Sequence, residues 1–113
     1  MKRGEIRWYE FKSPDKRRPV LIITRESVLE YLGETTIAPV TSTVRDIPSE
    51  VYLSRVDGMQ KDCAVFLDHI QTVSIEKIGS LITTLFSEKL KQVRSAILFA
   101  LGLQQINTVV ERL

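Results

Sequence analysis

Apolar residues in the first two thirds of the chain recur with the two-residue period that is typical of β-strands. Residues 5–11 alternate apolar and charged side chains, which predicts a strand buried on one face. Residues 18–24, RPVLIIT, are almost continuously apolar and rich in β-branched side chains, which predicts a strand covered on both faces. Pro19 fits the start of that strand, where no ladder donor is needed. The same pattern predicts further strands at residues 35–41, 50–54, 63–68 and 69–73.

A helical period replaces this pattern near the end of the chain. Residues 87–103 predict a helix that begins with Ser87 as its N-cap. Its apolar stripe consists of Leu90, Val93, Ile97 and Leu101. Residues 26–33 predict a shorter helix of about two turns, and Asp57-Gly58 predicts a turn. Several short strands followed by one terminal helix indicate a mainly β chain with a C-terminal helix (α+β), folded as a strongly bent antiparallel sheet or partial barrel.

The composition is that of one folded domain spanning residues 1–113, with 43% hydrophobic and 27% charged residues. Residues 104–113 either extend the helix, fray or contact another subunit. Cys63 is the only cysteine, which excludes an intrachain disulfide and favours a reducing compartment. The start of the chain shows no secretory pattern and no apolar run is long enough to cross a bilayer, so we expect a cytoplasmic protein without a membrane partner.

The usual catalytic motifs are absent from the sequence. One cysteine and one histidine cannot form a zinc site by themselves, and we expect neither a metal nor a cofactor. There is no glycine-rich phosphate loop and no serine nucleophile elbow. Cys63 and His69 are conceivable as a nucleophile pair, but a buried cysteine is the commoner explanation for a strand position.

Three consecutive basic residues at the foot of the second strand suggest a different chemistry. The net charge of +2 is too small to indicate a nucleic-acid binder by itself, so the position of the charges decides. If strands 18–24 and 35–41 are antiparallel neighbours, Arg18 and Thr41 lie on the same rim of the sheet. A guanidinium and a hydroxyl on one rim can clamp a phosphate, and Thr43 and Arg45 extend that surface. Exposed aromatic residues of the first strand would stack a base, the candidates being Trp8, Tyr9 and Phe11.

Ordinary structural roles explain the same residues equally well. Lys16 and Arg17 suit solvated loop charges, and Arg18 suits a weak surface ion pair at a strand end. Thr41 is a common strand residue, and Trp8 suits a core anchor. The spacing alone therefore indicates no more than a basic rim on a small β-barrel.

Taken together, five segments resemble the MazF/PemK family of toxin endoribonucleases of type II toxin–antitoxin systems. They are KRGEIRWYEF, RRPVLIIT, IAPVTST, IPSEVYLS and CAVFLDHIQTV, in this order and at similar spacing. The resemblance extends through Leu103 and implies an SH3-like small β-barrel of the MazF/CcdB type, usually a homodimer. It also implies cleavage of single-stranded RNA (messenger RNA, with transfer and ribosomal RNA as further candidates) without a metal, leaving 2′,3′-cyclic phosphate and 5′-hydroxyl ends. A cognate antitoxin protein would neutralise the toxin.

The resemblance also implies roles for particular residues. The catalytic arginine of the family's RPV motif falls on Arg18, and the catalytic threonine of its APVTS motif falls on Thr41. We expect RNA contacts from Lys16, Arg17, Thr43, Arg45, His69 and Gln71.

The chain departs from the family pattern in three places, which leaves two other functions open. Residues 12–17 form a shorter first loop than many members have, so the role of that loop's acidic residue does not transfer, with Asp15 as a speculative substitute. His69 stands where the family commonly has Gln or Asn, and Gln71 where it often has Arg or Lys, which affects the expected sequence preference. The alternatives are a CcdB-like toxin that binds DNA gyrase and a catalytically inactive RNA-binding homologue.

Overall fold

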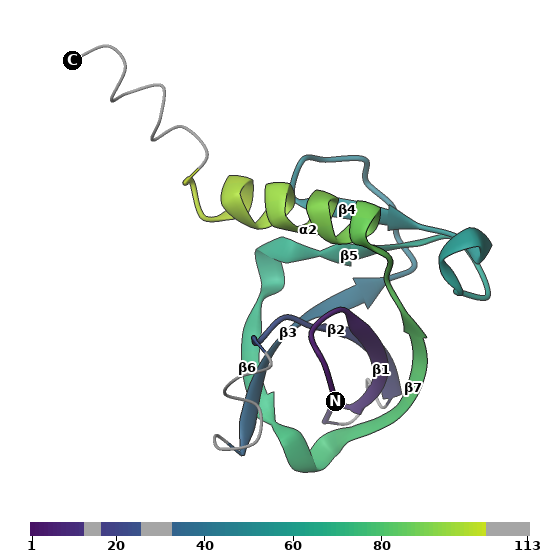
Figure 1. Ribbon diagram of the computed structural model, residues 1–113, viewed down its shortest axis with the longest axis vertical. Helices are drawn as coiled ribbons and strands as arrows, with labels where there is room; N and C mark the ends of the chain where they lie inside the picture. The colour runs from purple at the N-terminus through teal and green to yellow at the C-terminus, as the bar shows by residue number, and fades with distance from the viewer. Residues whose placement is uncertain (13–16, 26–32, 104–113) are drawn as a thin grey trace.

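The computed structural model describes residues 1–12, 17–25 and 33–103. Lys16, most of the helix predicted at 26–33 and the tail at 104–113 lie outside the described residues. Within the described part, seven strands form one curled sheet in which the neighbouring strands are antiparallel (Figure 1). The strands are β1 (Glu5–Glu10), β2 (Arg17–Ile22), β3 (Glu34–Thr41), β4 (Glu50–Leu53), β5 (Cys63–Phe66), β6 (Gln71–Ser74) and β7 (Ile78–Thr84).

The order of the strands is β4-β5-β3-β2-β1-β7, and β6 also pairs with β3. Strand β3 holds the sheet together because residues 34–37 pair with β6, whereas Val40 and Thr41 pair with β5. Figure 1 shows β6, β3, β2, β1 and β7 curling round into an open ring, with the helix α2 (Ser87–Ala100) lying across β4 and β5. This arrangement confirms the mainly β fold with a C-terminal helix and the strongly bent sheet.

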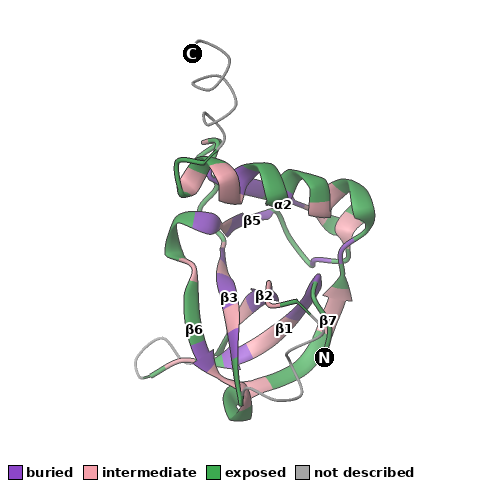
Figure 2. Ribbon diagram, turned by 60° about the vertical axis from the view of Figure 1, so that its left-hand side comes forward, coloured by how far each residue is buried: buried purple, intermediate pink, exposed green. Residues whose placement is uncertain are grey.

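The core is divided between the two sides of this curl. Ile6, Leu21 and Val65 belong to a large cluster that packs against Val93 and Ala96 of α2. A smaller cluster on the other side consists of Tyr9, Val20, Ile22, Ile37 and Val73. Strand β2 contributes to both clusters, and its residues Val20, Leu21 and Ile22 are at most 1% exposed, which confirms the prediction of a strand covered on both faces. In Figure 2 the buried positions lie mainly on the strands, and much of α2 is exposed.

Three details of the sequence-based prediction were wrong. Strand β7 was not predicted, because its residues IGSLITT lack a clean alternation and its pairing with β1 shifts register twice. The segment 69–73 is not one strand, since residues 67–69 form the 3-10 turn η2 before β6 begins at Gln71. The N-cap of α2 is Phe86, without a side-chain hydrogen bond, and Ser87 is the first helical residue.

The end of α2 is set by a Schellman motif. The amide of Leu103 donates to the carbonyl of Leu98, and the amide of Gly102 donates to that of Phe99. Gly102 has φ of 72°, a conformation that glycine adopts without the steric cost that other residues pay. The helix therefore ends at Ala100, just before the predicted end at 103.

Candidate functional site

Arg18 and Thr41 line the same pocket, which has a volume of about 560 Å³. The pairing of β2 with β3 explains this. Val20 lies opposite Pro39. Arg18 lies two residues before Val20 and Thr41 two residues after Pro39, so the same antiparallel register brings them to one rim. Arg18 is exposed and Thr41 is half-buried. The structure therefore brings together the two residues for which the sequence predicts catalytic roles.

The other residues of the pocket suit a nucleotide. Trp8, Pro19 and Leu81 provide apolar surface, and Lys61 adds a second cationic side chain to the lining that Arg18 also joins. The volume falls within the range of about 300–1,000 Å³ that is usual for small-molecule sites. Apolar walls can accept a base while cations bind the adjoining phosphate.

Trp8 and Arg17 form a cation–π pair at this pocket. The guanidinium carbon of Arg17 lies 4.8 Å from the centroid of the Trp8 ring. Trp8 is half-buried and lines the pocket, so it is a pocket wall and not a residue of either core cluster. Tyr9, by contrast, is 7% exposed and packs edge-on against Phe11, with the ring centroids 4.6 Å apart, which makes it a core residue.

The loop after β3 connects Thr41 with two more of the predicted RNA contacts. The hydroxyl oxygen of Thr41 accepts a hydrogen bond of 3.1 Å from the amide of Thr43, whose carbonyl in turn accepts one of 3.4 Å from the guanidinium of Arg45. Arg45 also forms an ion pair of 3.0 Å with Glu50, whose side chain is only 2% exposed. Arg45 is therefore paired with an almost fully buried carboxylate, while its own side chain stays 45% exposed.

Arg45 leads on to the remaining predicted contacts. Its guanidinium carbon lies 5.1 Å from the centroid of the Phe66 ring, and the Phe66 and His69 ring centroids are 4.3 Å apart. The side-chain amide of Gln71 donates to the carbonyl of His69 at 3.4 Å. A continuous series of contacts thus runs from Thr41 to Gln71.

Ser49 connects the loop after β3 with the residues of η2 through two hydrogen bonds. Its carbonyl accepts a hydrogen bond of 2.9 Å from the amide of Leu67, and its hydroxyl donates one of 2.5 Å to the carboxylate of Asp68. Ser49 is 2% exposed. The loop that carries Thr43 and Arg45 is therefore held against η2 (Leu67–His69), which carries His69.

Cys63 is a buried structural residue in this structure. Its side chain lines the pocket and the residue is 4% exposed, and burial, followed by the nearby charges of Asp57 and Asp62, raises the pKa of the thiol. A raised pKa disfavours the thiolate that nucleophilic catalysis needs. The ring of His69 packs on Phe66, so the geometry favours the buried-cysteine interpretation over a Cys63–His69 nucleophile pair.

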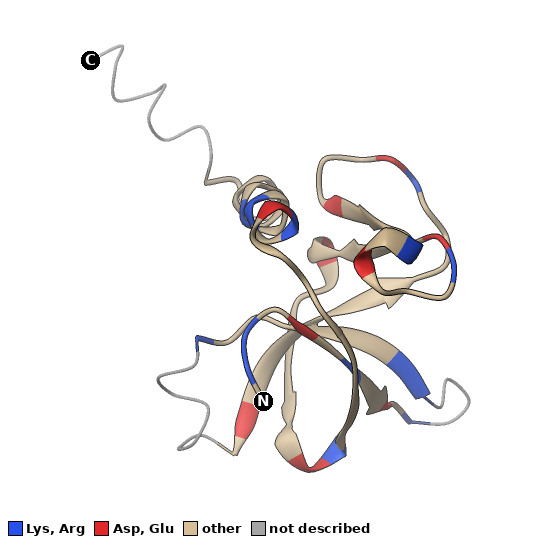
Figure 3. Ribbon diagram, turned by 45° about the vertical axis from the view of Figure 1, so that its right-hand side comes forward, with Lys and Arg blue, Asp and Glu red and all other residues tan. Residues whose placement is uncertain are grey.

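Sequence reasoning missed the contribution of the segment after β4. The pocket is closed on one side by Met59, Gln60 and Lys61, which follow the Asp57-Gly58 turn. That turn was visible in the sequence, but its packing against β7 was not, because β7 itself carries no clear strand pattern. Figure 3 shows basic and acidic positions interspersed along the described chain, so the charge distribution alone does not mark the site.

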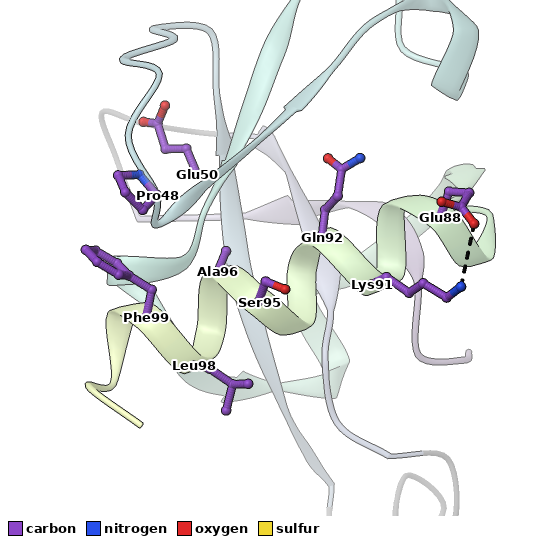
Figure 4. A pocket seen from close by; sticks show the side chains of 9 residues that line it. All are labelled: Pro48, Glu50, Glu88, Lys91, Gln92, Ser95, Ala96, Leu98 and Phe99. Carbon is purple, nitrogen blue, oxygen red and sulfur yellow. Dashed lines mark ion pairs between the residues drawn. The ribbon is translucent and has the colours of Figure 1, made fainter. Parts of the chain in front are cut away.

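A second groove lies between α2 and the end of the loop before β4. Figure 4 shows Pro48 and Phe99 at one end of this groove and the Glu88–Lys91 ion pair, 3.6 Å long, at the other. It contains none of the residues for which the sequence predicts a role in catalysis or RNA binding.

Two other findings concern the described residues only. They hold no group of three or more His, Cys, Asp or Glu side chains arranged to bind a metal ion. Among them, no helix has the length and apolar character needed to cross a membrane.

Comparisons with known proteins agree with the resemblance. The chain is 43% identical over 65 residues to Endoribonuclease MazF3 of Mycobacterium tuberculosis, covering 58% of this chain and 63% of that protein. It is 33% identical over 93 residues to Probable endoribonuclease MazF2 of the same species, covering 81% and 89%. The match to MazF3 thus spans less than two thirds of that relative's length.

Solved structures show the same fold. Mycobacterium tuberculosis toxin MazF-mt6 superposes with a TM-score of 0.81 at 35% identity, covering 88% of this chain and 98% of that one. An endoribonuclease from a mycobacterial species, solved in complex with its cognate antitoxin, gives 0.81 at 21% identity over 91% and 96% of the two chains, which supports the fold alone. The model of the family described as "PemK-like, MazF-like toxin of type II toxin-antitoxin system" matches residues 2–101. The chain therefore belongs to the PemK-like, MazF-like toxins of type II toxin–antitoxin systems.

Proposed function

We propose that this protein is a sequence-selective endoribonuclease that cleaves single-stranded RNA without a metal ion. The observation that carries the proposal is the meeting of Arg18 and Thr41, from neighbouring strands, in one pocket walled by Trp8. The relatives named endoribonuclease MazF3 and probable endoribonuclease MazF2 support the same activity.

The proposed reaction is an intramolecular transesterification. The ribose 2′-oxygen attacks the adjacent phosphorus and loses its proton to water, while the bond from phosphorus to the 5′-oxygen breaks and that oxygen takes a proton from water. The products are a 2′,3′-cyclic phosphate and a 5′-hydroxyl. Negative charge builds up on the nonbridging oxygens, and Arg18, which stays charged, stabilises it. The hydroxyl of Thr41 orients the phosphate.

The flanking nucleotides would follow the series of contacts from Thr41 to Gln71. Thr43 and the exposed edges of His69 and Gln71 offer hydrogen-bonding groups, and the stacked rings of Phe66 and His69 offer a surface for a base. Arg17, stacked on Trp8, would contact the backbone on the opposite side of the pocket. Because Arg45 is paired with Glu50, we assign it mainly to holding this surface together.

We further propose that an antitoxin protein inhibits this toxin and that the toxin acts as a homodimer in the cytoplasm, where messenger RNA is found. The family description, which names a type II toxin-antitoxin system, supports the first point. Exposed apolar side chains at the end of α2 support the second, since such patches commonly mark interfaces. They are Phe99 at 44%, Leu101 at 60% and Leu103 at 44% exposure.

Incubation of a long, mixed-sequence single-stranded RNA with the protein in EDTA tests the activity. We expect discrete fragments with cyclic-phosphate ends from the wild type, and none from Arg18→Ala or Thr41→Ala. Arg94→Ala, which removes an exposed arginine of α2 outside both grooves, is the matched control and should cleave normally. Absence of cleavage by folded wild-type protein would refute the proposal and make binding to DNA gyrase the next activity to test.

A further inference from the structure

The segment 54–62, between β4 and β5, is a loop held by several internal hydrogen bonds. It begins with a capping box in which the hydroxyl of Ser54 accepts from the amide of Val56 and the carboxylate of Asp57 accepts from the amide of Ser54. The 3-10 turn η1 (Arg55–Asp57) follows and ends at Gly58. The guanidinium of Arg55 donates to the carbonyl of Gln60 at 3.2 Å, which closes the loop on itself.

Strand β7 holds this loop in place. The hydroxyl of Thr83 donates to the carbonyl of Asp57 at 2.9 Å. Gly58 has φ of 97°, and any Cβ at this position would overlap the side chain of Thr83. Met59 is 8% exposed within the large core cluster. The position of the next two residues, Gln60 and Lys61, is therefore fixed from both sides.

Lys61 brings a positive charge into the pocket of Arg18 and Thr41. No ion pair of Lys61 is found within the described residues, whereas Arg45 is paired with Glu50. The neighbouring carboxylate of Asp62 faces Tyr52 and raises the pKa of that phenol. Lys61 and Cys63 both line this pocket. Burial, Asp57 and Asp62 raise the pKa of the Cys63 thiol, and the nearby charge of Lys61 opposes that rise more weakly.

We infer that Lys61 is a second phosphate-binding residue of this site. A single-stranded RNA carries a phosphate at every nucleotide, so two cations in one pocket can bind the scissile phosphate and its neighbour, or the same phosphate from two directions. Lysine binds phosphate as a point charge and tolerates either arrangement. The inference rests on the proposed ribonuclease function and adds to it a residue that the family motifs RPV and APVTS do not contain.

Binding of a non-cleavable RNA tests this inference. Cleavage sites are first mapped on a long RNA, and a short oligonucleotide of the mapped sequence is then made with a 2′-deoxy sugar at the scissile position. Its dissociation constant is measured over a series of salt concentrations for wild type, Lys61→Gln, Lys61→Arg and Lys77→Gln. Lys77 is an exposed lysine of the 3-10 turn η3 (Ile75–Lys77) that lines neither groove, so its variant is the control.

We expect Lys61→Gln to weaken binding roughly tenfold at low salt and to lower the slope of log K against log salt by about 0.7, the value for one phosphate contact on a single strand. Lys61→Arg should bind nearly as wild type, and Lys77→Gln should leave both quantities unchanged. Unchanged affinity and slope in Lys61→Gln, in a protein that still requires Arg18 for cleavage, would overturn the role of Lys61 while the proposed function stands. A wild type that neither cleaves nor binds RNA would overturn both.

Discussion

At the scale of single residues, Gly58 is the glycine at which an added side chain would come closest to a neighbouring atom. Alanine there would hold a left-handed conformation, at a cost of about 1–2 kcal/mol, and its Cβ would push against the side chain of Thr83. We predict that Gly58→Ala lowers the free energy of unfolding by more than this conformational cost alone. Denaturation in urea measures the change.

Gly102→Ala separates strain from overlap in this prediction. Gly102 also has a positive φ, of 72°, but among the described residues no atom beyond its chain neighbours lies within 4 Å of where its Cβ would stand. The free energy of unfolding of Gly102→Ala should therefore fall only by the cost of the left-handed conformation. Equal losses in the two variants would show that Thr83 does not hold the loop tightly, and would weaken the account of how Lys61 is positioned.

Glu5 makes a pH-dependent contribution to stability. Burial raises its pKa, but the hydrogen bond from Arg7 at 2.8 Å, the one from the amide of Lys2 at 3.0 Å and the charge of Arg7 outweigh burial, so the pKa lies below the ordinary value of 4.5. A carboxylate whose pKa is lowered on folding stabilises the protein above its unfolded-state pKa. That contribution is lost as the pH falls through the folded-state pKa.

Glu5→Gln should therefore destabilise the protein at neutral pH by about 1.5–3 kcal/mol, the range for a hydrogen bond to a charged group. The difference from wild type should shrink as the pH falls below the ordinary pKa of 4.5. Urea denaturation over this pH range measures it, with Glu88→Gln as an exposed control. If the difference in the free energy of unfolding between wild type and Glu5→Gln stays constant with pH, the charge of Glu5 does not stabilise the protein.

At the scale of elements, the hydrogen bonds of Ser49 to Leu67 and Asp68 determine how well the loop after β3 is held. Ser49→Ala removes the hydrogen bond to Asp68 and leaves the pocket of Arg18 and Thr41 intact. We predict that the KM for RNA rises several-fold while kcat changes little, because the contacts beyond Thr41 lose their order and the reacting groups do not. Steady-state cleavage of the mapped oligonucleotide separates the two constants.

Ser95→Ala, on an exposed position of α2, is the control for this variant. A fall in kcat with an unchanged KM would contradict the assignment of this loop to RNA binding. It would instead place Ser49 in the path that positions Thr41.

The elements that the sequence predicts well are those whose pattern is local. The continuous apolar run of β2 and the helical stripe of α2 both gave the correct element. The antiparallel pairing of β2 and β3 was assumed in the sequence analysis, and the structure shows it. Strand β7 escaped prediction because its residues IGSLITT, Gly79 among them, lack a clean alternation of apolar and polar side chains. Its partner β1 also lies far away in the sequence. Ser87 was misplaced as the N-cap of α2 by one residue, since the cap at Phe86 uses no side chain.

At the scale of the whole molecule, the curl of the sheet assembles the pocket. Arg18 and Thr41 could be placed together from the sequence once β2 and β3 were assumed to be antiparallel neighbours, because Arg18 lies near the start of one strand and Thr41 ends the other. Lys61 and Leu81 could not, because they reach the pocket only when β7 closes against β1 and holds the loop before β5. The ion pair between Arg45 and Glu50 could not be predicted from the sequence either, because only the fold of the loop between them brings the two side chains together.

We claim that the pocket of Arg18 and Thr41 is a metal-free ribonuclease centre, so the single-turnover rate of RNA cleavage in EDTA should depend on Arg18. We predict that Arg18→Ala lowers this rate by about 10³-fold or more, as expected when charge stabilisation in the transition state is lost. Arg94→Ala should cleave at the wild-type rate. A folded Arg18→Ala protein that cleaves nearly as fast as the wild type would contradict the claim.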